Sequence, residues 1–258
     1  MQFTKYHGTG NDFILVDDRE LLFPENPARI AGLCDRHFGI GADGLLLLRA
    51  SADFDFEMIY YNSDGSAATF CGNGGRCIVA FARKLGITGK ECRFMAADGL
   101  HHATIPEEFP DEMTVSLEMR DALIYEHNPG YSYLNTGTYH VVQFVEDPGK
   151  MDIIAAGRRI RYDERYTPHG TNVNFVKQSG NQLFVRTYEK GVEGETLSCG
   201  TGVTASAVAA SLRDGGSLYR IRTAGGSLEV RLNNTDGKVS GILLQGAATK
   251  VFDGIINL

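Results

Sequence analysis

Two stretches of this sequence make the same junction, TFCGNGGRCIVAFA at residues 69–82 and TLSCGTGVTASAVAA at residues 196–210. In each, a cysteine is followed by glycines and then by a run of small and apolar residues. The runs predict helices over 72–85 and 200–213 that are apolar on nearly every face, which is typical of helices buried inside a domain. Gly86 and Gly215 provide plausible C-terminal stops. The sequence therefore places two cysteines, Cys71 and Cys199, at the N-termini of buried helices.

Other segments repeat at about the same spacing as the two cysteines, which lie 128 positions apart. At this offset Ala96 aligns with Ala224 and Leu100 aligns with Leu228. With a small shift, GTGNDFILVDD at 8–18 also resembles NTGTYHVVQFVED at 135–147. Several weak matches at nearly one offset favour an internal duplication over chance similarity. We expect a domain over 1–120 that carries Cys71 and a second over 121–246 that carries Cys199, with the boundary near 119–130, where periodicity is lost.

Most of the remaining chain has the pattern of strands, in short runs rich in β-branched and aromatic residues and bounded by Gly, Asn or Asp. These runs cover 13–16, 45–48, 56–61, 113–119, 139–145, 172–176, 182–188 and 227–232. A third helix is expected over 152–161, and NNTDG at 233–237 reads as a hairpin turn. The sequence thus predicts an α+β protein in which strands wrap two buried helices.

The composition excludes several classes of function. Lysine and arginine total 25 against 32 acidic residues, a net charge of −7, and no basic run offers a binding surface for nucleic acid or an anionic membrane. The N-terminus lacks the apolar core of a signal peptide, and no apolar run approaches a membrane span. We therefore expect a cytoplasmic protein without nucleic-acid or membrane partners.

Three of the five cysteines, Cys34, Cys77 and Cys92, are interpreted as small buried hydrophobes. No CxxC unit occurs, and the spacing of Cys71 and Cys77 matches no common zinc site, so no metal is expected. GIGADG at 39–44 fits a dinucleotide-binding pattern, but a strand follows it where that motif needs a helix. These glycines are read as tight turns.

Cys71 and Cys199 differ from the other cysteines because a helix N-terminus stabilises negative charge. That position lowers the pKa of a thiol, and nearby glycines let the backbone approach a carboxylate. The alternative is a pair of packed core cysteines. A near-symmetric pair of thiols beside a carboxylate is what inversion of a stereocentre needs, because one base removes the α-proton and an acid on the opposite face returns one.

The residues around these cysteines resemble the diaminopimelate epimerase family. The matching motifs are KYHGTGNDF (5–13), NSDGSAATFCGNGGRC (62–77), GTNVNF (170–175) and YEKGVEGETLSCGTG (188–202), in register along the whole chain. Proline racemases and the phenazine-biosynthesis isomerase are more distant relatives. The resemblance implies two similar domains, each a mostly antiparallel, barrel-like sheet around a central helix, with the active site in the cleft between them. It also implies that the C-terminal strand, 247–258, returns to the first domain.

The resemblance further implies a pyridoxal-independent epimerase, without cofactor, that converts LL- to meso-diaminopimelate in lysine and peptidoglycan-precursor synthesis, and a homodimer. Cys71 and Cys199 match the paired acid and base, and His140 and Glu189 match groups that tune the thiols. Gly72 with Asn73 and Gly200 with Thr201 match the cradle for the α-carboxylate. The other substrate-binding positions are Asn11, Asn62, Asn172 and Glu189, which match the family, and Lys190, which takes the place of an arginine.

Four departures from the family pattern lie around the distal half of the substrate or its rim. Thr138 stands where the family has an asparagine, and Lys190 where it has an arginine that grips the distal carboxylate. A lysine keeps the charge but loses the bidentate fork. Gly44 often corresponds to glutamine, and GVEGET (191–196) has one residue more than the commoner GVGET.

Two alternatives remain open from the residues. One is a cofactor-independent racemase of another amino acid on the same fold. The other is a non-catalytic carboxylate-binding protein or a thiol redox protein, for which a reversible Cys71–Cys199 disulfide would be the working state.

Overall fold

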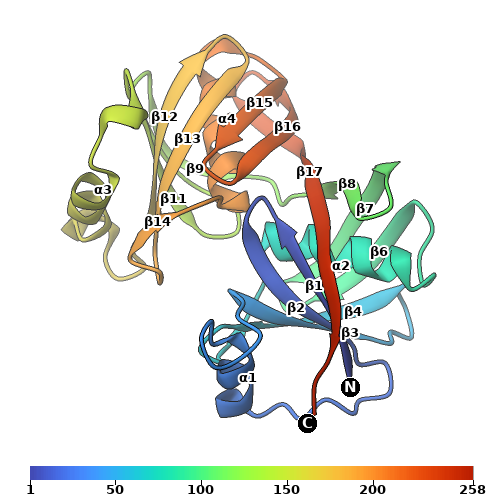
Figure 1. Cartoon of the computed structure of the whole chain (residues 1–258). Helices are drawn as coiled ribbons and strands as arrows, with labels where there is room; N and C mark the ends of the chain where they lie inside the picture. Colours follow the sequence, from blue (N-terminus) through green and yellow to red (C-terminus); the bar gives the residue numbers. More distant parts are fainter. Residues whose placement is uncertain (258) are drawn as a thin grey trace. The chain divides into compact units, whose positions relative to one another are not determined.

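The computed structural model describes residues 1–257, which divide into two compact units. Unit 1 comprises Met1–Leu117 with Gly246–Leu258, and unit 2 comprises Glu118–Gln245. The last strand, β17 (Lys238–Ile255), begins in unit 2 and ends in unit 1 (Figure 1). In unit 1 it pairs antiparallel with the first strand, from Gln2 opposite Ile255 to His7 opposite Thr249.

Unit 1 contains two α-helices and, besides the end of β17, eight strands. They are β1 (Gln2–Gly8), β2 (Asn11–Asp17), α1 (Pro27–Cys34), β3 (Gly44–Arg49), β4 (Phe56–Asn62), β5 (Ala67–Ala68), α2 (Gly72–Lys84), β6 (Glu91–Ala96), β7 (Gly99–Glu108) and β8 (Glu112–Glu118). β17 pairs with both β1 and β8, so the sheet closes into a barrel. The pairs β2–β3 and β4–β6 are parallel, and the other strand pairs of the barrel whose direction is resolved are antiparallel.

The elements of unit 2 are β9 (Leu123–Asn128), β10 (Tyr131–Asn135), β11 (Tyr139–Phe144), α3 (Ile153–Arg161), β12 (Asn172–Ser179), β13 (Gln182–Glu189), β14 (Gly194–Thr196), α4 (Gly200–Asp214), β15 (Leu218–Thr223) and β16 (Gly226–Thr235), with short 3₁₀ turns at Pro148–Lys150 and Glu164–Tyr166. From β10 onward unit 2 repeats the order of elements of unit 1, with β9 added before it and the start of β17 as its last strand. The parallel pairs are now β11–β12 and β13–β15. The expected α+β class with two similar domains is confirmed.

In each unit, one crossover helix lies inside the strands and the other lies outside them. α4 packs against β9, β10, β11, β12, β13, β15 and β16, and α2 packs against β1, β2 and β3 (Figure 1). α1 instead covers Ile14, Val16 and Leu47 on the opposite face of β2 and β3. Because β2 and β3 are covered on both faces, their sequences are continuous apolar runs, as is usual for buried parallel strands.

The predicted helices over 72–85, 152–161 and 200–213 are confirmed as α2, α3 and α4. α4 ends at Gly215, whose φ of 75° needs the left-handed region that glycine tolerates. α1 was not predicted from the sequence, because it is only 8 residues long and its proline at the first turn resembles a loop signal. The segment expected to lose regular structure near 119–130 contains β9.

The expected repeat offset is right for the buried helices and wrong by one position for the hairpin that follows each of them. Gly72 and Gly200 begin equivalent helices. In the hairpins, Ala96 pairs with Gly99 and Thr223 pairs with Gly226, so Ala96 is equivalent to Thr223 and not to Ala224. Unit 2 has one residue fewer between its buried helix and the hairpin, and a single fixed offset cannot follow that deletion.

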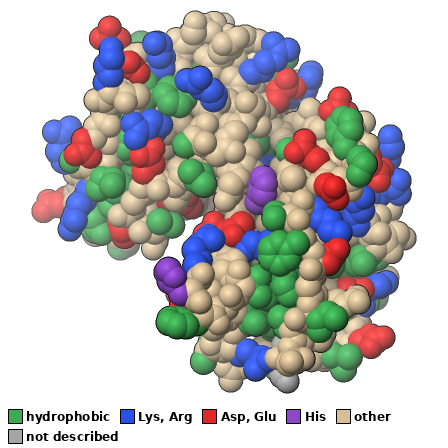
Figure 2. Space-filling view, viewed as in Figure 1, with side chains coloured by type: hydrophobic (Ala, Val, Ile, Leu, Met, Phe, Trp, Pro, Cys, Tyr) green, Lys and Arg blue, Asp and Glu red, His purple; other side chains and the backbone are tan. Residues whose placement is uncertain are grey.

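The charged side chains on the surface do not form a basic patch on the face that Figure 2 draws. Acidic and basic side chains are interspersed over the face drawn in Figure 2. Among the helices in residues 1–257, none is long and apolar enough to cross a membrane.

Two helix glycines provide a matched test of the packing of the outer helices. A methyl group at Gly157 in α3 would overlap the side chain of Tyr188 on β13, whereas one at Gly32 in α1 would meet nothing within 4 Å. Gly157→Ala is expected to lower the free energy of unfolding by about 1–2 kcal/mol despite the better helix propensity of alanine. Gly32→Ala is expected to raise it by up to about 1 kcal/mol. Urea denaturation measures both, and equal stability of the two variants would contradict this packing.

Candidate active site

Cys71 caps the N-terminus of α2. Its φ and ψ of −140° and 124° are extended, and its carbonyl accepts the first helical hydrogen bond from the amide of Gly75, at 2.7 Å. The thiol is half-buried and donates to Oδ1 of Asn11 across 3.5 Å. The first amides of a helix have no partner inside it and carry the positive end of its dipole. Cys71 therefore lies where a negative charge is stabilised.

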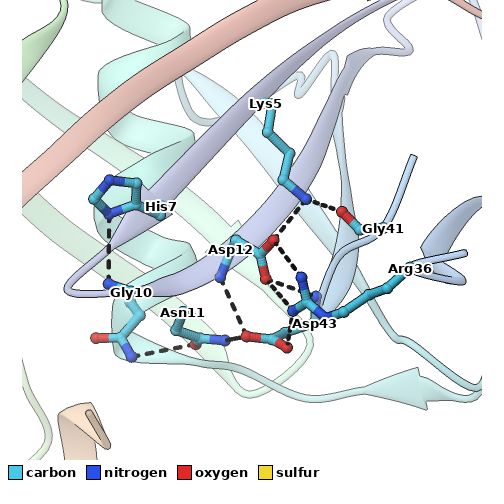
Figure 3. Close-up of polar contacts among 9 residues, drawn as sticks. Lys5, His7, Gly10, Asn11, Asp12, Arg36, Gly41 and Asp43 are labelled. Carbon is cyan, nitrogen blue, oxygen red and sulfur yellow. Dashed lines mark hydrogen bonds and ion pairs between the residues drawn. The ribbon is translucent and has the colours of Figure 1, made fainter. Parts of the chain in front are cut away.

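The amide of Asn11 is held in one orientation (Figure 3). Its Nδ2 donates to Oδ2 of Asp43 at 2.8 Å, and its Oδ1 accepts from Nδ2 of Asn73 at 3.2 Å. Because an ionised carboxylate only accepts hydrogen bonds, the nitrogen of Asn11 must face Asp43. Its oxygen consequently faces Asn73 and the thiol of Cys71.

A network of charges fixes Asp43 (Figure 3). Arg36 Nη2 lies 2.7 Å from both Asp12 and Asp43, and Lys5 Nζ lies 2.7 Å from Asp12. Burial favours a higher pKa for Asp12, but the hydrogen bonds from Arg36 and Lys5 outweigh it and lower that pKa. Lys5 also donates to the carbonyl of Gly41, inside the GIGADG segment. That segment is therefore a turn that supports Asn11, and the strand β3 follows it as predicted.

Asn62 and Gly44 lie opposite each other on β4 and β3. Asn62 donates through Nδ2 to Ser66 Oγ at 3.1 Å, which closes the turn into β5. A Cβ atom at Gly44 would lie 2.6 Å from the carbonyl oxygen of Tyr61 and 2.7 Å from the ring of Tyr60, so this backbone leaves no room for a side chain there. The role of Asn62 in binding substrate stays a prediction.

Cys199 caps α4 as Cys71 caps α2. Its φ and ψ of −117° and 113° are also extended, and its carbonyl accepts from the amide of Val203 at 2.9 Å. The residue is 7% exposed, and its Sγ lies 3.4 Å from Oγ1 of Thr201. The two thiols thus occupy equivalent backbone positions but have different polar neighbours.

His140 is linked to Cys199 by hydrogen bonds through the hydroxyl of Thr201. Its Nε2 lies 2.9 Å from Thr201 Oγ1, and its Nδ1 lies 3.1 Å from Nδ2 of Asn174. Asn174 Nδ2 also donates to the carbonyl of Val141, which only accepts, so this atom is the amide nitrogen and Nδ1 of His140 must accept. The proton is therefore on Nε2, which donates to Thr201. Burial, with a smaller contribution from Lys190, lowers the pKa of His140 to about 3, so the ring is neutral at neutral pH.

The hydroxyl of Thr201 accepts from His140, which leaves its own hydrogen available to donate to a thiolate at Cys199. A hydrogen bond donated to a thiolate lowers the pKa of the thiol. The chain from Asn174 through His140 and Thr201 to Cys199 consequently favours the ionised form of Cys199. Sequence reasoning missed Asn174, although it lies two positions after Asn172 on the same strand, and alternation places both on one face.

Asn172 joins the ends of two strands. Its Nδ2 donates to the carbonyl of Tyr139 at 3.1 Å, and its Oδ1 accepts from the amide of Lys190 at 2.8 Å. Glu189 accepts from the hydroxyl of Thr196 at 2.8 Å. Asn172, at the start of β12, therefore links the first residue of β11 to the residue that follows β13, and Glu189 links the end of β13 to β14. Contact of the three predicted residues Asn172, Glu189 and Lys190 with substrate stays a prediction.

Glu193 lies in the segment that is one residue longer than the common family pattern. Its φ is 54°, and its carboxylate accepts from Arg161 at 3.1 Å and from the hydroxyl of Tyr162 at 3.0 Å, both near the end of α3. The ammonium of Lys190 donates to the carbonyl of His169 at 3.1 Å. The longer loop is therefore attached to α3 and to the segment before β12.

The other three cysteines are buried, as predicted. Burial raises the pKa of Cys34 to about 11 and that of Cys92 to about 12, and it also raises the pKa of Cys77. Thiols in this state are poor nucleophiles.

Comparison with known proteins agrees with the geometry. A family model described as diaminopimelate epimerase matches residues 3–122 and 132–251. The diaminopimelate epimerase of Flavobacterium psychrophilum is 48% identical over 99% of this chain and 100% of its own length. The diaminopimelate epimerase of Archaeoglobus fulgidus is 39% identical over 99% of this chain and 96% of its own length.

Solved structures with low sequence identity share the fold. A phenazine biosynthesis protein of the PhzF family from Bacillus anthracis has a TM-score of 0.78 at 13% identity and covers 100% of this chain and 99% of its own. A probable proline racemase from Agrobacterium radiobacter has a TM-score of 0.72 at 17% identity, covering 100% and 93%. Because the family model matches both halves and close relatives align over nearly the whole length, this chain belongs to the diaminopimelate epimerase family.

Proposed function

We propose that this protein is a pyridoxal-independent epimerase that converts LL- to meso-diaminopimelate, with Cys71 and Cys199 as its acid and base. The observation that supports it most is the equivalence of the two cysteines. Each caps the buried helix of its unit at the same point of a repeated topology. The curated relatives that align over nearly the whole chain are named diaminopimelate epimerase.

The proposed reaction moves one proton off the α-carbon and another onto it. A thiolate removes the α-proton from one face and becomes a thiol, and the second thiol delivers its proton to the opposite face and becomes a thiolate. Reversal exchanges these roles, so a near-symmetric pair of groups serves both directions. The proposal requires one substrate molecule to meet both thiols.

The carbanion that forms in between needs stabilisation through its carboxylate. We assign this task to the amides at the two helix N-termini, at Gly72 with Asn73 and at Gly200 with Thr201. Such amides are oriented before the reaction begins and need no reorganisation when charge develops. Gly202 adds a steric reason for glycine in this turn, since a methyl group there would overlap Oδ1 of Asn174.

Residues around the two cysteines are proposed to bind the substrate and to tune the thiols. Asn11, Asn62, Asn172 and Glu189 are proposed to bind the substrate, and Lys190 to meet its distal carboxylate as a single charge without the fork of an arginine. His140 is proposed to tune Cys199 through Thr201, and Glu189 to tune a thiol. The enzyme is further proposed to be a cytoplasmic homodimer that needs no cofactor.

Incubation in heavy water tests the substrate. LL-diaminopimelate is expected to exchange its α-hydrogen for deuterium and to form the meso isomer, because the returning proton comes from a thiol that equilibrates with solvent. Mass spectrometry and chiral chromatography measure both. Other amino acids, including proline, serve as controls. Exchange with one of them and none with diaminopimelate would support the racemase alternative instead.

Replacing either thiol tests the two-base mechanism. Cys71→Ser and Cys199→Ser are each expected to lower kcat by about 10²–10⁴-fold, because a serine hydroxyl is a far weaker acid and base at these positions. A coupled assay for meso-diaminopimelate measures the rate. Cys92→Ala, which removes a buried thiol of β6, is expected to leave kcat unchanged. Near-normal turnover by either serine variant would disprove two-thiol catalysis.

Thr201 tests the hydrogen-bond chain to Cys199. In a Cys71→Ser background, Thr201→Val is expected to shift the pH midpoint of Cys199 alkylation upward by up to about one unit, because the thiolate loses a donor. Thr201→Ser keeps the hydroxyl and should retain the original midpoint. Iodoacetamide labelling followed by mass spectrometry gives both midpoints. An unchanged midpoint in the valine variant would show that this hydroxyl does not stabilise the thiolate.

A further inference from the structure

Arg76 is a fully buried cation in the interior of unit 1. It lies on α2, four residues after Gly72, and is 0% exposed. Burying a charge is costly unless an opposite charge accompanies it. A guanidinium does not escape this cost by losing its proton, because its pKa remains far above neutral. The position of Arg76 therefore needs a reason beyond packing.

The acceptors around Arg76 are neutral throughout the part of the chain that the structure describes. Its Nη1 donates to the carbonyl of Gly72 at 3.2 Å, and its Nη2 donates to Oδ1 of Asn73 at 2.9 Å. Longer contacts of 3.5 Å reach Oγ1 of Thr9 and the carbonyl of Ala247. Each nitrogen of the guanidinium thus has an acceptor, but its charge has no counterion among residues 1–257.

Unit 2 shows that this helix does not require a charge at the equivalent position. Thr204 lies four residues after Gly200, is fully buried, and donates through Oγ1 to the carbonyl of Gly200 at 2.9 Å. A neutral hydroxyl thus makes in α4 the same hydrogen bond that Arg76 makes in α2. The two buried helices differ by one positive charge at matched positions, directly behind the first turn.

The contacts of Arg76 converge on the residues next to Cys71. The carbonyl of Gly72 belongs to the peptide group that carries the N–H of Asn73, so a charged donor on that oxygen strengthens this N–H as a donor. Asn73 in turn donates from Nδ2 to Asn11, whose Oδ1 accepts from the thiol of Cys71. Arg76 thereby holds Asn73, and through it Asn11, in place. The oxygen of Asn11 accepts from the neutral thiol, so it is the charge of Arg76 and the strengthened N–H of Asn73 that favour the thiolate.

We propose that Arg76 is a positioning residue that stabilises negative charge at the N-terminus of α2, on the thiolate of Cys71 and on the carboxylate of the substrate. This inference rests on the proposed function, because the negative charges that would accompany Arg76 are the Cys71 thiolate and the substrate carboxylate of the epimerase reaction. The buried charge distinguishes the N-terminus of α2 from that of α4, where the neutral Thr204 stands at the matched position.

The other ionisable groups near Cys71 in unit 1 do not supply this charge. Around Asn11, the partner of the Cys71 thiol, they are His7 and Lys5 on β1, Asp12 on β2, and Arg36 and Asp43 in the segment before β3 (Figure 3). On α2, Cys77 interacts with both Cys71 and Arg76. Lys5 and Arg36 are already paired with the carboxylates of Asp12 and Asp43. Burial lowers the pKa of Arg76, while its interactions with Cys77 and then Cys71 act in the opposite direction. Cys77 stays neutral because burial raises its own pKa.

Alkylation of Cys71 tests the proposal without any substrate. In a Cys199→Ser background, Arg76→Gln keeps hydrogen-bond donors but removes the charge. The pH midpoint of iodoacetamide labelling at Cys71 is expected to rise by about one unit or more, because the thiolate loses a nearby positive charge. Mass spectrometry identifies the labelled cysteine, and circular dichroism checks the fold.

Arg83→Gln is the matched control, since Arg83 lies in the last turn of the same helix and pairs with Glu108 at 3.1 Å. Its labelling midpoint should equal that of the parent. An unchanged midpoint in folded Arg76→Gln overturns the proposal. The labelling is independent of the activity assays, so epimerisation by the wild type together with an unchanged midpoint would refute the role of Arg76 and leave the proposed function intact.

The pH dependence of stability provides a second measurement if Arg76→Gln does not fold. A thiol whose pKa is lower in the folded state contributes stability that is present above its unfolded pKa and is lost as the pH falls through the folded pKa. Between about pH 6 and about pH 9, wild type should therefore gain stability relative to Cys71→Ala, measured by urea unfolding. A difference that does not change with pH would overturn the proposal.

Discussion

The rest of the structure depends on one constraint, the N-terminus of a helix that is enclosed by strands. The first amides of α2 and α4 have no partner inside the helix, and the dipole adds a partial positive charge at the same point. Strands cover the sides of each helix, which explains why its residues are mostly small or apolar. A cysteine at the cap then becomes a thiol in an environment that favours its anion.

The scaffold is repeated, but its two thiol sites are not. Cys71 donates to the oxygen of Asn11, while Cys199 lies beside a hydroxyl that accepts a hydrogen bond from a neutral histidine. Behind the first helical turn, Arg76 in unit 1 is replaced by Thr204 in unit 2. A backbone repeat therefore supplies two geometrically equivalent thiols, and side-chain differences give them separate electrostatic environments. Different electrostatic environments suit two thiols of which one acts as a base while the other acts as an acid.

Much of the fold was predictable, because the buried helices and the strands beside them carry strong patterns. FILV and LLLL lie in strands covered on both faces, so their apolar runs are continuous. One strand with a weak pattern, β9, was missed because its residues are mostly exposed. The C-terminal part of β17 was expected only from the family resemblance, because its own pattern is interrupted by glycines at 241, 246 and 254. Local patterns cannot detect a strand that is stabilised mainly by its neighbours in the sheet.

The sequence by itself determined the two capped helices, the duplication and the pair of cysteines, since each depends on residue type and spacing along the chain. Family resemblance added the neighbours His140 and Asn11. Only the tertiary structure decided how those neighbours act: His140 is neutral and reaches Cys199 through Thr201, and Asn11 is fixed by Asp43. It also showed that Arg76 is buried without a carboxylate partner within residues 1–257. Burial, protonation and counterions depend on residues distant in sequence, and the fold alone brings those together.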